Sequence, residues 1–197
     1  MSDAIFLKSY ADPKAVPHDG PPQVAILGRS NAGKSSLINS LAKSKDLAKT
    51  SSTPGRTQLI NLFAFGKEFV LVDLPGYGFA NVAGEKRTSM RDLIFGYLEE
   101  SGPLAGAIVV TDSRIGTTKD DEEMIRALKD AGIFIILVAN KIDKLSRSEQ
   151  SARERELTRQ YPDAVIVPNS CLSGDGRGEL IQAIRQRVQS FKKIETT

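Results

Sequence analysis

The chain has few of the features that stabilise secreted proteins or anchor membrane proteins. Cys171 is the single cysteine in 197 residues, so no internal disulfide can form, which is typical of a reducing compartment. No run approaches the roughly 20 apolar residues of a membrane span. The N-terminus also lacks the basic-then-apolar pattern of a signal peptide. We therefore expect a cytoplasmic protein without membrane contact.

Histidine is equally scarce. Basic and acidic residues are nearly balanced, at 27 and 24. The only histidine, His18, follows Pro17 in a proline-rich segment, and we interpret it as an exposed loop residue rather than a catalytic or metal-binding one. The net charge of +3 and the pI near 9.0 permit an RNA partner without requiring one. A hydrophobic content of 40% and a charged content of 26% are typical of one globular domain.

The hydrophobic pattern alternates between strands and helices. Strands are expected at 24–27, 59–65, 69–72, 107–110, 133–138 and 164–167, and helices at 36–42, 88–100, 118–128, 146–160 and 180–191. Gly66-Lys67 indicates a hairpin between two of the strands. The alternation predicts a three-layer α/β fold, with a mostly parallel six-stranded sheet, one antiparallel edge strand and helices on both faces. Ligands bind at the carboxyl ends of such strands.

A full phosphate-binding loop, G-x-x-x-x-G-K-[ST], follows the first expected strand. Its residues are Gly28, Arg29, Ser30, Asn31, Ala32, Gly33, Lys34 and Ser35. Strand, glycine loop and helix in this order direct backbone N–H groups and a helix N-terminus at an anion. Lys34 is expected to reach the β- and γ-phosphates, and the Ser35 hydroxyl to bind Mg²⁺. Arg29 is expected to point outward or to pair with an acid.

A D-x-x-G motif follows the strand at 69–72. It consists of Asp73, Leu74, Pro75 and Gly76. An acidic residue at a strand end near the phosphate loop suits a partner of Mg²⁺ that acts through a metal-bound water. Gly76 lets its backbone N–H approach a γ-phosphate, because no Cβ intervenes. Alone, this motif usually marks a turn. Its position at a strand end, about forty residues after Lys34, makes it strong evidence for a nucleotide site.

Two further motifs follow the last two strands. The first, N-K-x-D, is Asn140, Lys141, Ile142 and Asp143, and the second is Asn169, Ser170 and Cys171. The Asp143 carboxylate can accept hydrogen bonds from guanine N1–H and the N2 amino group, which adenine lacks. The Lys141 stem can cover the base, and Asn140 can tie this loop to the phosphate loop. In the second motif, a backbone N–H is expected at guanine O6, with Ser170 bracing the loop and Cys171 as a small filler.

A polar segment at 43–58 contains candidate hydroxyls for the metal and the γ-phosphate. Thr50, Thr53 and Thr57 all offer a hydroxyl and an N–H group, and a contact of that kind is lost on hydrolysis. Thr57 is favoured because it lies next to the following strand.

Three motifs together resemble the EngB family of bacterial GTPases, within the translation-factor-related class of P-loop GTPases. They are the phosphate loop, Thr-Pro-Gly-Arg-Thr-Gln at 53–58 and Asp-Leu-Pro-Gly-Tyr-Gly at 73–78, and the resemblance covers about residues 5–190. It implies a Ras-like G domain at 22–193, between an N-terminal arm at 1–21 and a tail at 194–197. Asn140 departs from a family that often has Thr there, and Cys171 stands where Ser is more usual.

The resemblance also implies site residues, a cofactor and a cellular role. Ser35 and Thr57 become the Mg²⁺ ligands, and the nucleotide contacts gain Gly55, Arg56, Thr57, Gln58 and Leu59. The catalytic candidates are then Lys34, Thr57 and Gly76. The family is linked to assembly of the large ribosomal subunit and to normal cell division and septation. A guanine nucleotide and ribosomal RNA are therefore the expected partners, with no DNA and a monomeric chain.

Hydrolysis is expected to be slow. Tyr77 occupies the place where Ras-like switches carry a water-orienting glutamine. A resemblance to potassium-stimulated relatives points to Asn31 as a K⁺ ligand, and a loop hydrogen bond is its competing role. Basic residues suited to neutralising RNA phosphates are Arg153, Arg155, Arg159, Arg177, Arg185, Arg187, Lys192 and Lys193.

Two other functions remain open from the sequence. One is a nucleotide-binding scaffold with negligible hydrolysis, which Tyr77 keeps under consideration. The other is a P-loop kinase or ATPase, which requires the motif at 140–143 to be a coincidence.

Overall fold

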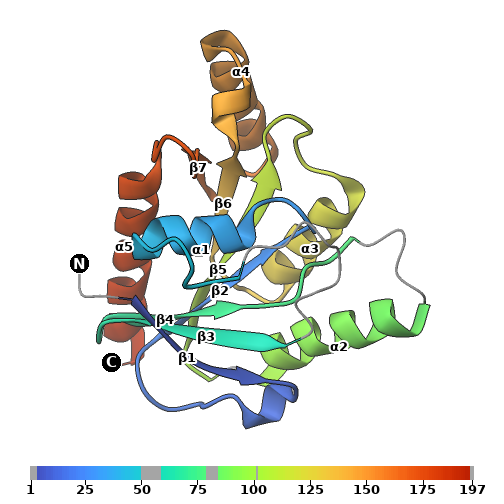
Figure 1. Cartoon of the computed structure of the whole chain (residues 1–197). Coiled ribbons are helices and arrows are strands. Elements are labelled where there is room, and N and C mark those ends of the chain that lie inside the picture. The colour runs from blue at the N-terminus through green and yellow to red at the C-terminus, as the bar shows by residue number, and fades with distance from the viewer. Residues whose placement is uncertain (1–3, 50–58, 79–83, 101, 196–197) are drawn as a thin grey trace.

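The structure is a computed structural model that describes residues 4–49, 59–78, 84–100 and 102–195 (Figure 1). These residues form one twisted sheet with helices packed on both of its faces. This arrangement confirms the three-layer α/β class that the alternation of strands and helices predicts.

Seven strands form the sheet within the described residues, in the spatial order β1-β3-β4-β2-β5-β6-β7. Their bounds are β1 Ala4–Tyr10, β2 Gln23–Gly28, β3 Ile60–Phe65, β4 Phe69–Asp73, β5 Leu104–Asp112, β6 Ile135–Asn140 and β7 Val165–Asn169. β3 pairs antiparallel with β1 and β4, and the pairs from β4 through β2 to β7 are parallel. The carboxyl ends of five parallel strands therefore meet at one edge of the sheet, where the sequence motifs follow them.

The sheet has one strand more than the six predicted from sequence. The additional strand, β1, lies within the segment 1–21 that is expected to be an arm. Its pairing places the antiparallel strand β3 one position inside the edge of the described sheet. Ile5, Phe6 and Leu7 are each about half exposed, so β1 lacks the two-residue alternation that marks a strand. Its position depends on pairing with β3, where Phe6 packs edge-on against Phe63.

The described part of the chain also contains five α-helices and two short 3₁₀ helices. They are η1 Pro13–Ala15, α1 Lys34–Ala42, α2 Gly84–Glu100, α3 Lys119–Asp130, η2 Ile142–Lys144, α4 Arg147–Gln160 and α5 Arg177–Glu195. Thr118 and Ser146 cap α3 and α4, each through reciprocal hydrogen bonds with the acidic residue three positions later. Each box pairs residues three positions apart, at the starts of the helices expected at 118–128 and 146–160. None of the described helices has the length and hydropathy needed to cross a bilayer.

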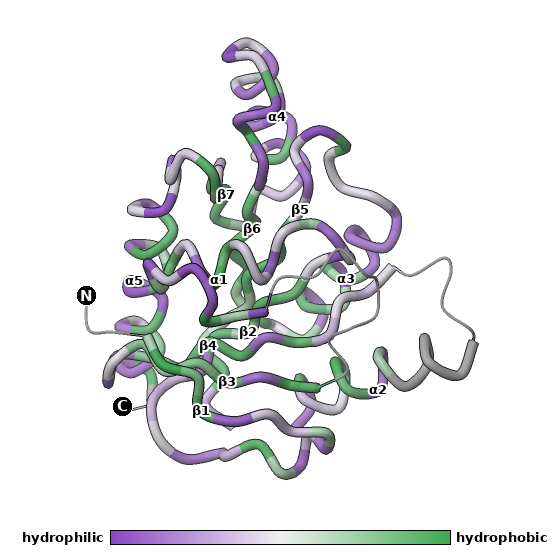
Figure 2. The backbone as a smooth tube through the Cα atoms, viewed as in Figure 1, coloured by the Kyte–Doolittle hydropathy of each residue, from purple (hydrophilic) through white to green (hydrophobic). Residues whose placement is uncertain are grey.

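The hydrophobic core has two layers, one on each face of the sheet. Helices α1 and α5 cover one face, and α2, α3 and α4 cover the other. Leu180, Ile184 and Val188 of α5 are buried, as their helical spacing predicts, and burying each contributes roughly 1.5–3 kcal/mol. Figure 2 shows mostly hydrophobic strands and a mostly hydrophilic α4, which buries Leu157. The core thus fixes the strand ends that carry the motifs.

Candidate functional site

The phosphate loop joins β2 to α1 at the carboxyl edge of the sheet. Gly28 ends β2, and a Cβ there would lie 2.6 Å from the Val110 carbonyl oxygen, so only glycine allows this approach to β5. Gly33 caps α1 with a φ of +105°, and a Cβ on it would overlap the Asn140 amide. The first N–H groups of a helix have no partner within the helix. The loop therefore presents a site for an anion at the N-terminus of α1.

Lys34 and Asp73 face each other across this end of the sheet. Lys34 Nζ lies 3.6 Å from Asp73 Oδ1, and both residues are buried, at 9% and 3% exposure. Burial raises the pKa of Asp73, and the Lys34 ammonium offsets only part of that rise. Asp73 Oδ1 has no hydrogen-bond partner among the described residues. A buried oxygen without a partner is costly unless a ligand satisfies it.

The residues around Asp73 fit a magnesium ion. Mg²⁺ takes oxygen ligands and keeps several waters, so a carboxylate oxygen and a hydroxyl are suitable neighbours. The candidate for the hydroxyl, Ser35, is the second residue of α1 and follows Lys34. The segment at 43–58 holds further nucleotide and metal candidates. Four of them lie outside the described residues: Gly55, Arg56, Thr57 and Gln58. Leu59 is described and is 39% exposed, just before β3.

Asn140 and Lys141 connect the loop after β6 to the phosphate loop. Asn140 Nδ2 donates a hydrogen bond of 2.9 Å to the Ala32 carbonyl oxygen. Lys141 Nζ donates to the Asn31 carbonyl oxygen at 2.7 Å. The tie expected of Asn140 is therefore present, and the Lys141 side chain spans the distance between the two loops.

Asp112, which is not among the site residues predicted from sequence, holds Lys141 from the other side. Asp112 Oδ2 accepts a hydrogen bond of 2.8 Å from Lys141 Nζ, and Arg114 donates to both carboxylate oxygens. Burial acts to raise the pKa of Asp112, but the hydrogen bonds from Arg114 and Lys141 lower it well below its usual range. Asp112 is the last residue of β5, so the strand-end rule that selects the other motifs also selects it.

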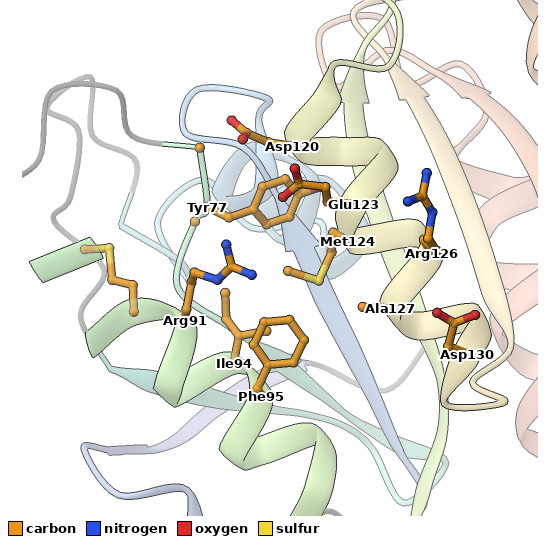
Figure 3. A pocket seen from close by; sticks show the side chains of 13 residues that line it. Tyr77, Arg91, Ile94, Phe95, Asp120, Glu123, Met124, Arg126, Ala127 and Asp130 are labelled. Atoms are coloured by element: carbon orange, nitrogen blue, oxygen red, sulfur yellow. The ribbon is translucent and has the colours of Figure 1, made fainter. Parts of the chain in front are cut away.

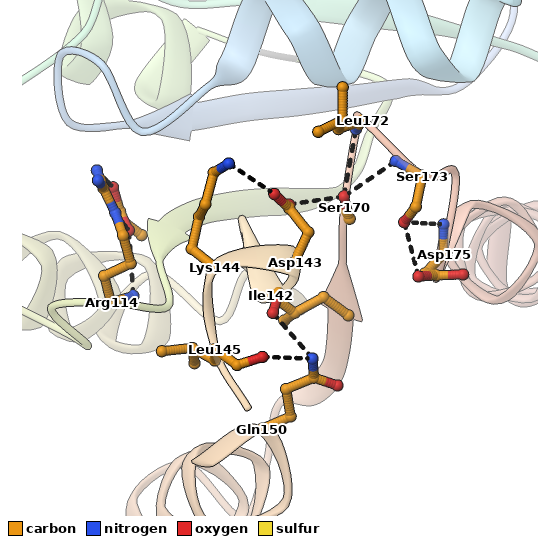
Figure 4. Close-up of polar contacts among 11 residues, drawn as sticks. Arg114, Ile142, Asp143, Lys144, Leu145, Gln150, Ser170, Leu172, Ser173 and Asp175 are labelled. Carbon is orange, nitrogen blue, oxygen red and sulfur yellow. Dashed lines mark hydrogen bonds and ion pairs between the residues drawn. The ribbon is translucent and has the colours of Figure 1, made fainter. Parts of the chain in front are cut away.

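Asp143 is held by the loop that follows β7 (Figure 4). Its Oδ1 accepts a hydrogen bond of 2.7 Å from Ser170 Oγ, and Lys144 Nζ lies 3.4 Å from its Oδ2. Ser170 Oγ also accepts from the N–H groups of Leu172 and Ser173, each at 3.2 Å. The bond from Ser170 lowers the pKa of Asp143, so the carboxyl is ionised at neutral pH. The role of Ser170 as a brace for the loop is thus visible in the geometry.

Asn169, at the end of β7, and Cys171, in the loop after it, both contact the Asn140 side chain. The Asn169 amide lies 3.0 Å from Asn140 Oδ1, and Cys171 Sγ lies 3.4 Å from the same oxygen. Burial raises the pKa of the Cys171 thiol. A protonated, half-buried thiol fits the interpretation of Cys171 as a small filler of the loop. Ile142 is buried beneath the loop, and its carbonyl oxygen accepts from Gln150 Nε2 at 2.9 Å.

The segment after β4 returns to the phosphate loop. Tyr77 N–H donates to the Gly28 carbonyl oxygen at 3.4 Å, and Ser30 N–H donates to the Tyr77 carbonyl oxygen at 3.3 Å. Arg29 has its Nε buried, with no hydrogen-bond partner among the described residues. A Cβ on Gly78 would lie 3.2 Å from Arg29 Nε and 2.6 Å from Asp120 Oδ2, so both side chains border Gly78. Arg29 thus turns toward α3.

Several of the basic residues considered for RNA contact have partners within the protein. Arg153 Nε donates to the Ser113 carbonyl oxygen at 3.1 Å. Arg185 forms two hydrogen bonds with Glu68, at 2.7 and 2.8 Å. Arg187 Nε donates to a backbone carbonyl of β5, and its guanidinium lies over the Phe134 ring. These three arginines have a structural role whatever else they contact.

Comparison with known sequences identifies related proteins over nearly the whole chain. The family model described as "50S ribosome-binding GTPase" matches residues 23–141, and the one described as "Elongation factor Tu GTP binding domain" matches residues 101–190. "Probable GTP-binding protein EngB" of Chlorobaculum tepidum is 42% identical over 93% of this chain and 96% of that protein. The protein of the same name from Halothermothrix orenii is 41% identical over 95% and 96%.

Solved structures share the fold. A crystal structure of a probable GTP-binding protein engB has a TM-score of 0.68 at 22% identity, covering 85% of this chain and 99% of that one. Era in complex with MgGDPNP and nucleotides of 16S ribosomal RNA has a TM-score of 0.72 at 28% identity, covering 86% of this chain and 57% of that one. The sequence relatives and the shared fold agree with the geometry of the site, and this chain belongs to the EngB family of GTP-binding GTPases.

Proposed function

We propose that this GTPase is a magnesium-dependent switch whose GTP-bound form docks on a maturing large ribosomal subunit. One observation carries the nucleotide part of the proposal: the bonds from Asn140 and Lys141 to the phosphate loop. They hold the loop of Asp143, which would read the base, next to the phosphate loop of Lys34, which would bind the phosphates, at one edge of the sheet. A guanine nucleotide spans that distance with its base at one end and its charge at the other.

Each described motif has a part in holding the nucleotide. Asp143 accepts from guanine N1–H and the N2 amino group, and a backbone N–H of the 169–171 loop reaches O6. The amides of residues 28–35 and the Lys34 ammonium neutralise the phosphates. Ser35 and Thr57 would hold the metal directly, and Asp73 would contact it through a metal-bound water. Mg²⁺, when bound, neutralises charge that develops on the β- and γ-phosphates.

Intrinsic hydrolysis is slow in this proposal. The Tyr77 hydroxyl donates to Asp121 Oδ1 at 2.9 Å, and its ring is 6% exposed. A side chain anchored in α3 does not orient an attacking water, so catalytic help comes from the docked partner. Single-turnover assays with and without ribosomal particles test this point. A rate that stays negligible in both arms would favour the alternative, a nucleotide-binding scaffold without turnover.

The ribosomal role draws its support from the family. The matching family model is described as a 50S ribosome-binding GTPase, and we propose the same partner for this chain, in the cytoplasm and as a monomer. Failure of subunit assembly would then account for a requirement in normal cell division and septation. Pull-down of ribosomal particles tests the docking, and we expect more large-subunit precursor with a non-hydrolysable GTP analogue than with GDP. Equal recovery with both nucleotides, at low and high salt, would contradict nucleotide-gated docking.

A further inference from the structure

Tyr77 is fixed at three points, and it directly follows Gly76. Two of these points are the main-chain bonds to the phosphate loop, from Tyr77 N–H to the Gly28 carbonyl oxygen and from Ser30 N–H to the Tyr77 carbonyl oxygen. The third is the side-chain bond of 2.9 Å from the Tyr77 hydroxyl to Asp121 Oδ1. The peptide of Gly76 is therefore attached to a residue that bridges the phosphate loop and α3.

The acceptor of the Tyr77 hydroxyl belongs to the cap of α3. Asp121 is buried, and its two carboxylate oxygens serve different partners. Oδ1 accepts from Tyr77, whereas Oδ2 accepts from Thr118 N–H at 2.9 Å and from Thr118 Oγ1 at 2.7 Å. A carboxylate fixed by a capping box is a rigid anchor. The Tyr77 bond thus ties the segment after β4 to the first turn of α3.

The Tyr77 ring lies in the core and also borders a cavity. A cavity of about 240 Å³ lies between α2 and α3, and Tyr77 forms part of its wall, with Met90, Ile94, Phe95 and Met124 (Figure 3). Tyr77 is nevertheless one of the buried residues of the core on this face of the sheet, at 6% exposure. The hydroxyl bond to Asp121 is the directional contact that selects this orientation of the ring.

We propose that Tyr77 is a positioning residue for recognition of the γ-phosphate, acting through the backbone of Gly76. The inference rests on the proposed function, in which the Gly76 N–H meets the γ-phosphate. GDP lacks that phosphate, so its affinity does not depend on where the Gly76 amide points. Loosening Tyr77 consequently weakens binding of GTP while binding of GDP is preserved. This assigns to Tyr77 a part in distinguishing GTP from GDP, in place of the water-orienting part that its side chain does not perform.

The test removes one oxygen atom from each of two buried tyrosines. Tyr77→Phe deletes the bond to Asp121 and keeps the ring. Tyr97→Phe is the matched control, because Tyr97 is 1% exposed and its hydroxyl donates to Gln23 Oε1 at 2.8 Å. Gln23 begins β2, at the strand end opposite the phosphate loop. Dissociation constants for GDP and a non-hydrolysable GTP analogue are measured with Mg²⁺ by fluorescent-nucleotide titration, and thermal melts confirm that each variant is folded.

The expected result is a change in the ratio of the two affinities. Tyr77→Phe lowers the affinity for the GTP analogue about tenfold, which is the scale of one hydrogen bond to a charged group. Its affinity for GDP stays within about twofold of that of the unmodified protein. Tyr97→Phe leaves the ratio as in the unmodified protein. An unchanged ratio in Tyr77→Phe, or an equal shift in Tyr97→Phe, would overturn the inference while the proposed function stands. Failure of the unmodified protein to bind either nucleotide would instead refute the proposed function.

Discussion

Asn140 Nδ2 donates a 2.9 Å hydrogen bond to the carbonyl oxygen of Ala32, 108 positions earlier in the chain. The bond lies beside Gly33, whose absent side chain leaves room for the Asn140 amide. It joins the loop proposed to read the base to the loop proposed to bind phosphate, so the distance between these two loops is set before any nucleotide arrives. Preorganisation of this kind lowers the ordering cost of binding.

Gly33→Ala is expected to disrupt that junction. The new methyl group would overlap the Asn140 amide, and φ at this position is +105°, so both steric overlap and backbone strain result. We expect guanine-nucleotide affinity to fall by more than about a hundredfold and stability to fall by about 2–4 kcal/mol, measured by nucleotide titration and urea unfolding. The control is Gly132→Ala, which has a φ of +69° and no atom within 4 Å of the added Cβ. If the two variants bind nucleotide equally well, the steric overlap with Asn140 does not affect nucleotide binding.

Asp143→Asn is expected to change the preferred base. An amide at this position offers a donor where guanine also offers one, whereas xanthine offers an acceptor, so affinity should move from guanine toward xanthine nucleotides. Competition between GDP and xanthosine diphosphate measures the change. Asp175→Asn serves as the control, because that carboxylate accepts from Ser173 Oγ at 2.6 Å in the next loop. A variant of Asp143 that keeps the original base preference would refute the assignment of Asp143.

Asp112 is expected to make stability depend on pH in the acidic range. Its pKa is lowered in the folded protein by Arg114 and Lys141, so the ionised carboxylate stabilises the fold above the unfolded value of about 3.9. That contribution is lost as pH falls through the lower folded value. We expect Asp112→Asn to be about 1–2 kcal/mol less stable at pH 6, with a gap that narrows below about pH 4.

Urea unfolding of the nucleotide-free protein between pH 6 and pH 3 measures this gap. Asp163→Asn is the matched control, since the pair between Lys129 and Asp163 is exposed at 63% and 70% and should contribute little. A gap for Asp112→Asn that stays constant or widens toward acid would show that the lowered pKa does not stabilise the fold.

Potassium is expected to accelerate GTP turnover through Asn31. The residue is exposed at the phosphate loop with a φ of +65°, and its carbonyl oxygen is held by Lys141. Turnover in KCl is compared with turnover in NaCl at equal ionic strength, for the unmodified protein and for Asn31→Gly. Glycine keeps the positive φ and removes the amide, so the variant should lose the stimulation and retain GDP binding. Equal rates in both salts for the unmodified protein would exclude the potassium role.

The described part of the nucleotide site follows a simple rule that the sequence alone could supply. Gly28, Asp73, Asn140 and Asn169 each end a strand, and neighbouring parallel strands bring those ends together. The capping boxes at Thr118 and Ser146 are equally local signals, because each depends on residues three positions apart. Features that depend on strand ends and short spacings could therefore be predicted without coordinates.

The features that the sequence did not reveal depend on contacts between distant residues. Asp112 reaches Lys141 across 29 positions, and Tyr77 reaches Asp121 across 44. The place of Asp112 at the end of β5 marks it as a candidate, but nothing in the sequence identifies Lys141 as its partner or Asp121 as the partner of Tyr77. β1 could not be predicted for the same reason. Its half-exposed residues show no alternation of buried and exposed side chains, and its position depends on pairing with β3. Such pairings require knowledge of which elements are neighbours in space.

The position of β1 outside β3 also bears on how the protein tolerates truncation. β1 supplies hydrogen bonds along the outer side of β3, from Ala4 opposite Phe65 to Tyr10 opposite Ile60. Deleting the first ten residues would leave those β3 backbone groups open to another chain, next to the hydrophobic side chains of Leu62 and Phe63. A shortened protein is therefore prone to self-association through strand pairing, even though the candidate nucleotide site lies at the carboxyl edge of the sheet, away from β1.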